Sequence, residues 1–250
     1  MMKNISIKLK LILFLFVFLV LVSLWEKDSN FFIKSIIAVL ATVAAEGLCF
    51  FIKSRSFKLT QSSLITGLII GFVLSSSQEW WLFLLAGFLA IILKHLIRFD
   101  GKHIFNPAAL GIFLTVVIFN KAAQWHGAYW WGMIIPFGLY FAWKIRKISL
   151  VSTYFVTYVL LSLVQWCWFK QPFWNQIYYA NWFFIFVMLV EPRTSPFKFT
   201  QNVFFGIIVS VFSFILYWVK LPFDADLPAL LLGNLIFGLY SRKKEVARGK

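Results

Sequence analysis

The chain has 250 residues, of which 61% are hydrophobic and 13% charged, and its mean hydropathy is +0.84. A soluble domain is roughly half apolar and a quarter charged, so this composition excludes that class and predicts an all-α polytopic membrane protein. The net charge of +15 would favour nucleic acid in a soluble chain, but membrane proteins gather Lys and Arg on the cytoplasmic side, and no basic stretch carries a nucleic-acid-binding module. We therefore expect contact with the lipid bilayer and no nucleic acid.

Ten apolar segments follow one another along the chain, and they predict about ten transmembrane helices in a single transmembrane domain over residues 1–250. Several segments fall short of the ~20 residues that a helix needs to cross the hydrocarbon core, and the third and eighth are the clearest cases. The segments cover residues 9–25, 31–52, 63–75, 80–97, 107–119, 128–145, 149–169, 180–190, 203–219 and 226–240.

Lysines and arginines alternate between the two sides of these segments. With the N-terminus in the cytoplasm, 19 of the 24 basic residues, among them Lys3, Arg248 and Lys250, fall in the inner stretches. Only 5 fall in the outer stretches. Since Lys and Arg favour the cytoplasmic side, the pattern predicts a multi-pass protein of the cell (inner) membrane with both termini in the cytoplasm.

The chain also contains a weak internal repeat. Similar elements recur in the two halves, at Thr66 and Thr194 and at Pro107-Ala108 and Pro228-Ala229. Two halves of five helices each have opposite topology, as inverted repeats do in transporters. We therefore expect two inverted five-helix pseudo-repeats, over approximately residues 1–125 and 126–250.

Three polar stretches break apolar segments where a simple membrane helix has no break. They are Ser63–Gly67, Phe105–Ala109 and Glu191–Pro196. In lipid, freed backbone N–H and C=O groups must find partners, so such breaks are tolerated where they line a protein cavity or a site. Asn106-Pro107 and Ser195-Pro196 each resemble a helix start, whose free N–H groups suit an anion, a phosphate or the polar edge of a flavin. The alternative is that both are ordinary caps at the membrane surface.

Two carboxylates are candidates for ion or proton handling. Glu46 lies inside the second segment, where a carboxylate is costly and indicates a site. The alternative for Glu46 is a position near the inner boundary, paired with a basic residue such as Lys53. Glu191 ends a segment directly before Pro192 and contributes to the hydrogen bonding of the break or to ion entry.

No metal site is expected from the remaining ligand-type residues. His95 and His103 flank the connection between the fourth and fifth segments, but no further ligands stand at a suitable spacing, so this connection is interpreted as an interfacial loop. Cys49 and Cys167 lie within apolar runs without C-x-x-C spacing, which predicts neither a disulfide nor a sulfur-ligated metal.

At the breaks the chain resembles a known family. The shared features are Ala45-Glu46, Leu64–Leu68, Phe105–Gly111, Glu191–Pro196 followed by Phe205-Gly206, and Leu230–Asn234 before a basic tail. They resemble the D subunit of the Rnf electron-transport complex and the B subunit of the sodium-translocating NADH:quinone oxidoreductase. The resemblance extends from about residue 40 to the end, and the family usually has Asp at the position of Glu191.

The resemblance implies a flavin-binding membrane subunit, built as an inverted repeat, that relays electrons in a complex coupling redox chemistry to Na⁺ or H⁺ translocation. Family members carry FMN linked to a threonine on the outer loop after the fifth helix. The corresponding loop here, residues 120–128, contains no threonine. We therefore expect a flavin, FMN or riboflavin, that is held noncovalently.

The sequence thus supports one leading hypothesis and two alternatives. In the leading hypothesis the chain is a non-autonomous subunit without catalytic residues of its own, and its partners are other membrane and soluble subunits such as a flavin or iron–sulfur reductase. The first alternative is a transporter or channel for a small solute in the same cavity, and the second is a membrane anchor for a soluble reductase. In the leading hypothesis the flavin is held by Thr66, Gly67, Asn106, Pro107, Thr194 and Ser195, and ions or protons are handled by Glu46 and Glu191.

Overall fold

Four helices among the described residues are long and apolar enough to cross a membrane. They are α1 (Ile7–Glu26), α2 (Ser29–Ser54), α7 (Ile148–Phe169) and α9 (Phe199–Trp218). The computed structural model describes residues 6–99, 101–178, 180–196 and 198–246, with side chains up to residue 240, so Lys3, Arg248 and Lys250 lie outside the described residues. With further shorter apolar helices between these four, the chain is an integral membrane protein of the all-α class.

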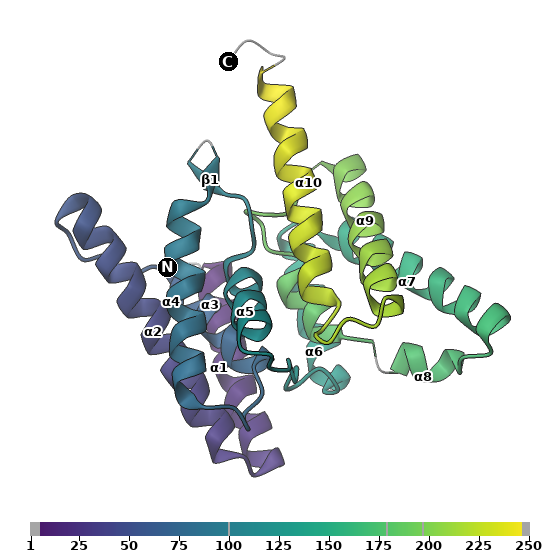
Figure 1. The fold of residues 1–250 in the computed structure, drawn as a ribbon, viewed down its shortest axis with the longest axis horizontal. Helices are drawn as coiled ribbons and strands as arrows, with labels where there is room; N and C mark the ends of the chain where they lie inside the picture. The colour runs from purple at the N-terminus through teal and green to yellow at the C-terminus, as the bar shows by residue number, and fades with distance from the viewer. Residues whose placement is uncertain (1–5, 100, 179, 197, 247–250) are drawn as a thin grey trace, which may run out of the picture. The chain divides into compact units, whose positions relative to one another are not determined.

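The chain divides into two units (Figure 1). Unit 1 comprises the residues up to Arg98 together with Pro107–Gly127, and unit 2 comprises Phe99–Asn106 and the residues from Ala128 onward. The connection between the fourth and fifth helices therefore belongs to the second unit, while both of those helices belong to the first.

Unit 1 contains α1 and α2 followed by α3 (Gln61–Val73), α4 (Trp80–Leu96) and α5 (Pro107–Ile118). Polar side chains cap the N-termini of α1, α2 and α3. Ser6, Asp28 and Thr60 accept hydrogen bonds from free backbone N–H groups in the first turns of these three helices. At 1.5 Å per residue, α3 spans only about 20 Å, against ~30 Å of hydrocarbon. Helix α3 is therefore too short to cross the hydrocarbon core by itself, and both of its ends lie inside unit 1.

Small residues allow α3 to lie directly against α2. A Cβ atom on Gly67 would stand 2.5 Å from Val39 Cα, and one on Gly71 would stand 2.4 Å from Ser35 Oγ. Thr42 Oγ1 also donates a hydrogen bond of 2.9 Å to the carbonyl of Ser63 across the same interface. Close approach through glycines four residues apart is a common packing mode of helices in lipid. The pattern Gly67-x-x-x-Gly71 is therefore a packing face.

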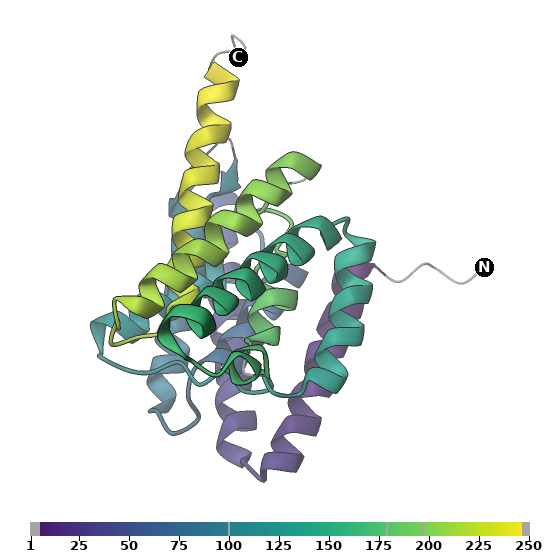
Figure 2. The same ribbon diagram turned by 90° about the vertical axis from the view of Figure 1, so that its right-hand side faces the viewer.

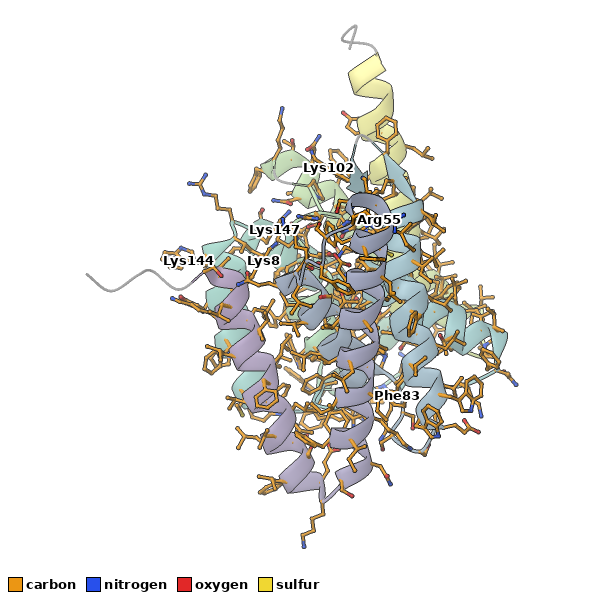
Figure 3. All side chains as sticks on the ribbon, turned by 90° about the vertical axis from the view of Figure 1, so that its left-hand side faces the viewer. Lys8, Arg55, Phe83, Lys102, Lys144 and Lys147 are labelled. Carbon is orange, nitrogen blue, oxygen red and sulfur yellow. The ribbon has the colours of Figure 1, made fainter. Side chains whose placement is uncertain are left out.

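The two ends of unit 1 differ in character. Lys8 and Arg55 lie toward one end of the unit, and Phe83 lies buried toward the other (Figure 3). At the Phe83 end the connections that follow α1, α3 and α5 meet: Ser76 Oγ donates to Asp28 Oδ2 at 2.5 Å, and the backbone N–H of His126 donates to the carbonyl of Phe72 at 2.7 Å. Successive helices of unit 1 therefore run in alternating directions, as the sequence predicts for residues 7–118.

A two-stranded hairpin, β1 (Arg98–Phe99) and β2 (Lys102–His103), stands between α4 and α5. The other elements of unit 2 are α6 (Trp131–Lys144), α7, α8 (Phe173–Tyr178), the π-helical turn η1 (Phe184–Met188), α9 and α10 (Asp226–Val246). Helix α9 packs on α7 and on α10, and the three can be followed in Figure 2.

The eighth expected segment differs from its prediction. Residues 180–190 were expected to form a short helix, but their regular core is the five-residue π-helical turn η1, in which the N–H of Leu189 bonds the carbonyl of Phe184. Asn181 Oδ1 accepts a hydrogen bond from the N–H of Phe184 and so starts this turn. Pro192 and the turns that follow do not continue a helix. The six-residue helix α8 before it was not predicted.

Candidate functional site

Unit 1 contains a buried polar cluster around Glu46, which we call the Glu46 centre. Lys94 Nζ lies 3.0 Å from each carboxylate oxygen of Glu46, and Thr60 Oγ1 donates to Oε1 at 3.2 Å. His95 Nε2 lies 3.4 Å from Oε2. Helix α2 supplies the carboxylate, the last turn of α4 supplies the lysine and histidine, and the start of α3 supplies hydroxyls. The centre comprises Glu46, Thr60, Ser62, Lys94 and His95.

The Glu46 carboxylate is neutralised by an unexpected partner. Glu46 is 2% exposed and Lys94 is 4% exposed, so both charges are buried and held by each other. The sequence suggested Lys53, which is exposed, as the partner. Lys94 stands among Ile91, Ile92 and Leu93 in an otherwise apolar helix, and that isolated charge was the signal that sequence reasoning passed over.

Two of the predicted flavin-binding residues, Thr66 and Gly67, lie on α3, whose first turn contributes to this centre. Thr66 is 5% exposed, and its hydroxyl donates to the carbonyl of Ser62 within the helix at 2.9 Å. The side of Gly67 that lacks a side chain is covered by Val39 and Thr42 of α2. Both residues therefore take part in the packing of α3.

The opposite end of unit 1 holds a second group of polar contacts. His126 is 3% exposed, stacks on Phe31 with ring centroids 4.1 Å apart, and places Nδ1 3.1 Å from Glu26 Oε2. Burial acts to raise the pKa of Asp28, but hydrogen bonds from Ser76 and from the N–H of Phe31 outweigh it, so this pKa lies below its ordinary value. The contacts of His126 hold the loop that follows α5 in place. They were not predicted from the sequence.

Unit 2 brings several predicted site residues together in what we call the Glu191 centre. One carboxylate oxygen of Glu191 lies 3.3 Å from His103 Nε2, and the other accepts a hydrogen bond of 3.1 Å from Thr194 Oγ1. Ser195 Oγ donates to the backbone carbonyl of Glu191 at 2.6 Å. The centre comprises His103, Asn106, Glu191, Thr194, Ser195 and Asn234.

Asn234 of α10 ties two of the breaks to each other. Its Oδ1 accepts the backbone N–H of Asn106 at 2.9 Å, and its Nδ2 donates to the carbonyl of Thr194 at 3.2 Å. Asn106 Nδ2 in turn donates to the carbonyl of Met188 at the end of η1 at 3.2 Å. Pro107 follows as the buried first residue of α5. The side chains of Asn106 and Asn234 thus satisfy backbone groups that the breaks set free.

Lys147 supports the Glu191–Pro196 break from the turn between α6 and α7. Its side chain is fully buried, and Nζ donates to the carbonyls of Ser195, at 3.1 Å, and Pro196. Burial lowers the pKa of Lys147 to about 8. Figure 3 labels this residue. Sequence reasoning counted Lys147 only as a cytoplasmic charge and missed its contact with the break.

These arrangements bear on whether the residues present fit a flavin. Thr66, Asn106, Thr194 and Ser195 are each at most 5% exposed, and each forms hydrogen bonds within its own unit. Their side chains therefore hold the breaks in shape and do not by themselves form a cradle open to a flat ring. Among the described residues, no three His, Cys, Asp or Glu side chains stand close enough to hold a metal ion.

A comparison with protein families relates the first half of the chain, which holds residues of both centres, to known proteins. The model of the NQR2, RnfD, RnfE family matches residues 3–132, just over half of the chain. The chain belongs to this family. The matched part of this NQR2, RnfD, RnfE family member includes the whole Glu46 centre, together with His103 and Asn106 of the Glu191 centre.

Two curated relatives that share a stretch of sequence with this family member are both named as the D subunit of an ion-translocating oxidoreductase complex. The relative from Aeromonas salmonicida is 31% identical over 103 residues, which are 40% of this chain and 29% of that protein. The relative from Pseudomonas aeruginosa is 35% identical over 86 residues, 33% of this chain and 25% of that protein. The alignments thus span between a quarter and a third of the length of these relatives.

Proposed function

We propose that this chain is a membrane subunit of a redox complex that couples electron transfer to the translocation of Na⁺ or H⁺. The observation that carries the proposal is its membership of the NQR2, RnfD, RnfE family, together with relatives named as subunits of an ion-translocating oxidoreductase. Its partners are then the other membrane and soluble subunits of such a complex, including a flavin or iron–sulfur reductase.

Ion handling is assigned in this proposal to Glu46 and Glu191. Ionisable side chains inside membrane proteins are costly and usually mark ion or proton paths. The carboxylate of Glu46 is 2% exposed and held by a lysine, while that of Glu191 keeps 21% exposure and is held by a histidine. The Glu46 carboxylate is suited to a centre that changes its charge only when Glu46 and Lys94 separate. The Glu191 carboxylate is suited to the exchange of ions or protons with water.

The proposal also includes the finer topology. Ten membrane-spanning elements in two inverted repeats, in the cell (inner) membrane with cytoplasmic termini, agree with the distribution of Lys and Arg in the sequence. The alternating helices of unit 1, with Lys8 and Arg55 toward one end, support the first half of this arrangement.

A noncovalently held flavin, FMN or riboflavin, is part of the proposal, and its support is the family rather than the side-chain geometry. A bound flavin supplies one- and two-electron redox chemistry. The test is the absorption spectrum of the purified protein before and after denaturation and filtration. We expect flavin absorbance that passes into the filtrate, because the loop of residues 120–128 has no threonine to hold it covalently.

Two other outcomes of that measurement carry information. Flavin that stays with the denatured chain contradicts noncovalent binding. A colourless protein that rebinds no added FMN or riboflavin removes the flavin from the proposal, and would favour a membrane anchor if a pigmented reductase co-purifies. Solute uptake by the chain alone, without any electron donor, would favour the transporter alternative.

A further inference from the structure

His103 is a buried titratable residue to which the proposed function gives no task. It is the last residue of β2, it is 3% exposed, and it belongs to the Glu191 centre of unit 2. Each of the three histidines in the chain lies within 3.4 Å of a glutamate, but Glu46 beside His95 is already neutralised by Lys94. The pair of His126 and Glu26 belongs to the other end of unit 1. His103 therefore differs from the other two histidines. Its partner Glu191 is a predicted ion-handling carboxylate that forms no ion pair with a lysine among the described residues.

The two ring nitrogens of His103 have different surroundings. Nε2 lies 3.3 Å from Glu191 Oε1. Nδ1 is buried and has no hydrogen-bond partner among the residues that the structure describes. A neutral imidazole has one nitrogen that donates and one that accepts, so a buried nitrogen without a partner calls for a proton donor or acceptor such as water. Nε2 of His126 is also buried without such a partner, so His103 is distinguished by the predicted ion-handling carboxylate on its other nitrogen.

The glutamate has a complementary arrangement. The Glu191 side chain keeps 21% of its surface exposed, whereas the His103 side chain keeps 1%. Thr194 holds the second oxygen of Glu191, so the first oxygen stays directed at His103. A proton from solvent therefore meets the carboxylate before it meets the imidazole.

The charged groups around the pair are few. Lys102 on the hairpin and Arg193 in the break are both exposed, and Asn234 and Asn106, which contact the centre, are neutral. From the turn before α7, the buried Lys147 directs its charge at the carbonyls of Ser195 and Pro196. The ion-pair partner of His103 among the described residues is Glu191. Glu191 is therefore the charged group that directly faces Nε2 of His103.

We propose that His103 relays protons between Glu191 and the interior of unit 2, which makes H⁺ the ion handled at this break. This inference rests on the proposed ion-handling role of Glu191. In the transfer step, the O–H bond of protonated Glu191 breaks as an N–H bond forms at Nε2. The N–H bond at Nδ1 breaks as its proton passes to a buried water molecule. The imidazole changes tautomer, and one proton enters for each one that leaves.

The test is ¹⁵N NMR of the full chain in lipid nanodiscs with labelled histidine. Only three imidazoles contribute signals, and His95→Gln and His126→Gln variants assign them. Over roughly pH 5 to 8, we expect the His103 signals to move from the Nε2–H form toward the Nδ1–H or doubly protonated form as pH falls. In Glu191→Gln, this pH-dependent change of tautomer should be lost, because the carboxylate that exchanges a proton with Nε2 is gone. Replacing Na⁺ by K⁺ at constant pH should leave the signals unchanged.

A His103 fixed as the Nε2–H tautomer throughout that range would overturn the relay, because a purely structural histidine behaves in that way. Signals that shift with Na⁺ at constant pH would overturn the assignment to protons. These outcomes are separate from failure of the proposed function. A titrating His103 in a chain that has no redox partner leaves the proton site standing. A redox complex that moves ions while His103 stays fixed leaves the function standing and removes the relay.

Discussion

At the scale of single residues, Lys94 is the group on which the Glu46 centre depends. Both charges are almost fully buried and lie 3.0 Å apart. Removing one partner of a buried ion pair leaves an uncompensated charge, whereas removing both leaves polar or apolar groups that pack without one. The centre should therefore tolerate the double substitution far better than the single one.

We predict that Lys94→Met lowers the free energy of unfolding by about 3–5 kcal/mol, and that Glu46→Gln combined with Lys94→Met recovers most of the loss. The matched control is Lys121→Met, because Lys121 pairs with Glu79 at 3.3 Å on the exposed surface, where an ion pair adds little to stability. Unfolding in detergent gives all three values. Equal losses for Lys94→Met and Lys121→Met would show that the buried pair is not formed.

Lys147 predicts a pH dependence of stability. Its pKa in the folded protein is about 8, against about 10.4 for an unfolded lysine, so the unfolded chain binds the proton more tightly. Between these two values the stability of the wild type should rise with pH, by at most about 1.4 kcal/mol per pH unit. The difference between wild type and Lys147→Met, measured by thermal unfolding from pH 7 to 10, should therefore grow in favour of the wild type. Parallel curves would exclude a buried, easily deprotonated Lys147.

At the scale of elements, the short helix α3 is held by its glycine face and by the loop after α5. Gly67 faces Val39 and Thr42 on α2, with no room for a side chain. We predict that Gly67→Ala costs about 1–3 kcal/mol, because the helices must move apart. Gly132→Ala in α6 is the control, since a Cβ atom there meets nothing within 4 Å. A Gly67→Ala protein as stable as the control would contradict the close packing of α2 and α3.

Most of the long helices could be predicted because a backbone that crosses lipid has to satisfy its own hydrogen bonds. Long apolar runs such as residues 31–52 have one stable form, a helix, and α2 confirms that prediction. The π-helical form of η1 could not be predicted, because its apolar composition resembles that of an ordinary helix. Asn181 before it and Pro192 after it would bound an ordinary helix equally well.

The partners within each centre could not be predicted from one sequence. Glu46 and Lys94 are 48 residues apart, and Asn106 and Asn234 are 128 residues apart. Local patterns marked Glu46 as costly in an apolar segment and Asn106 as the cap of a helix start at a break, which was enough to identify them as candidates. Only the fold shows which groups stand beside them, and so only the fold shows that the predicted flavin-binding side chains are already hydrogen-bonded.

At the scale of the whole molecule, the Glu46 centre and the Glu191 centre of this family member lie in different units. Unit 1 holds the Glu46 centre, and unit 2 holds the Glu191 centre with His103 and Asn234. The alignments with the two relatives cover at most 29% of the length of those proteins, so the coupling has to be tested on this chain.

The most direct test is redox-driven ion movement by the complex isolated with the tagged chain from its native membrane. After reconstitution in proteoliposomes, addition of an electron donor should drive Na⁺ or H⁺ movement. Glu191→Gln in the chain should slow that movement at least about tenfold while the complex still assembles. Ion or solute movement that the chain carries out alone, without partner subunits and without an electron donor, would contradict the proposed function.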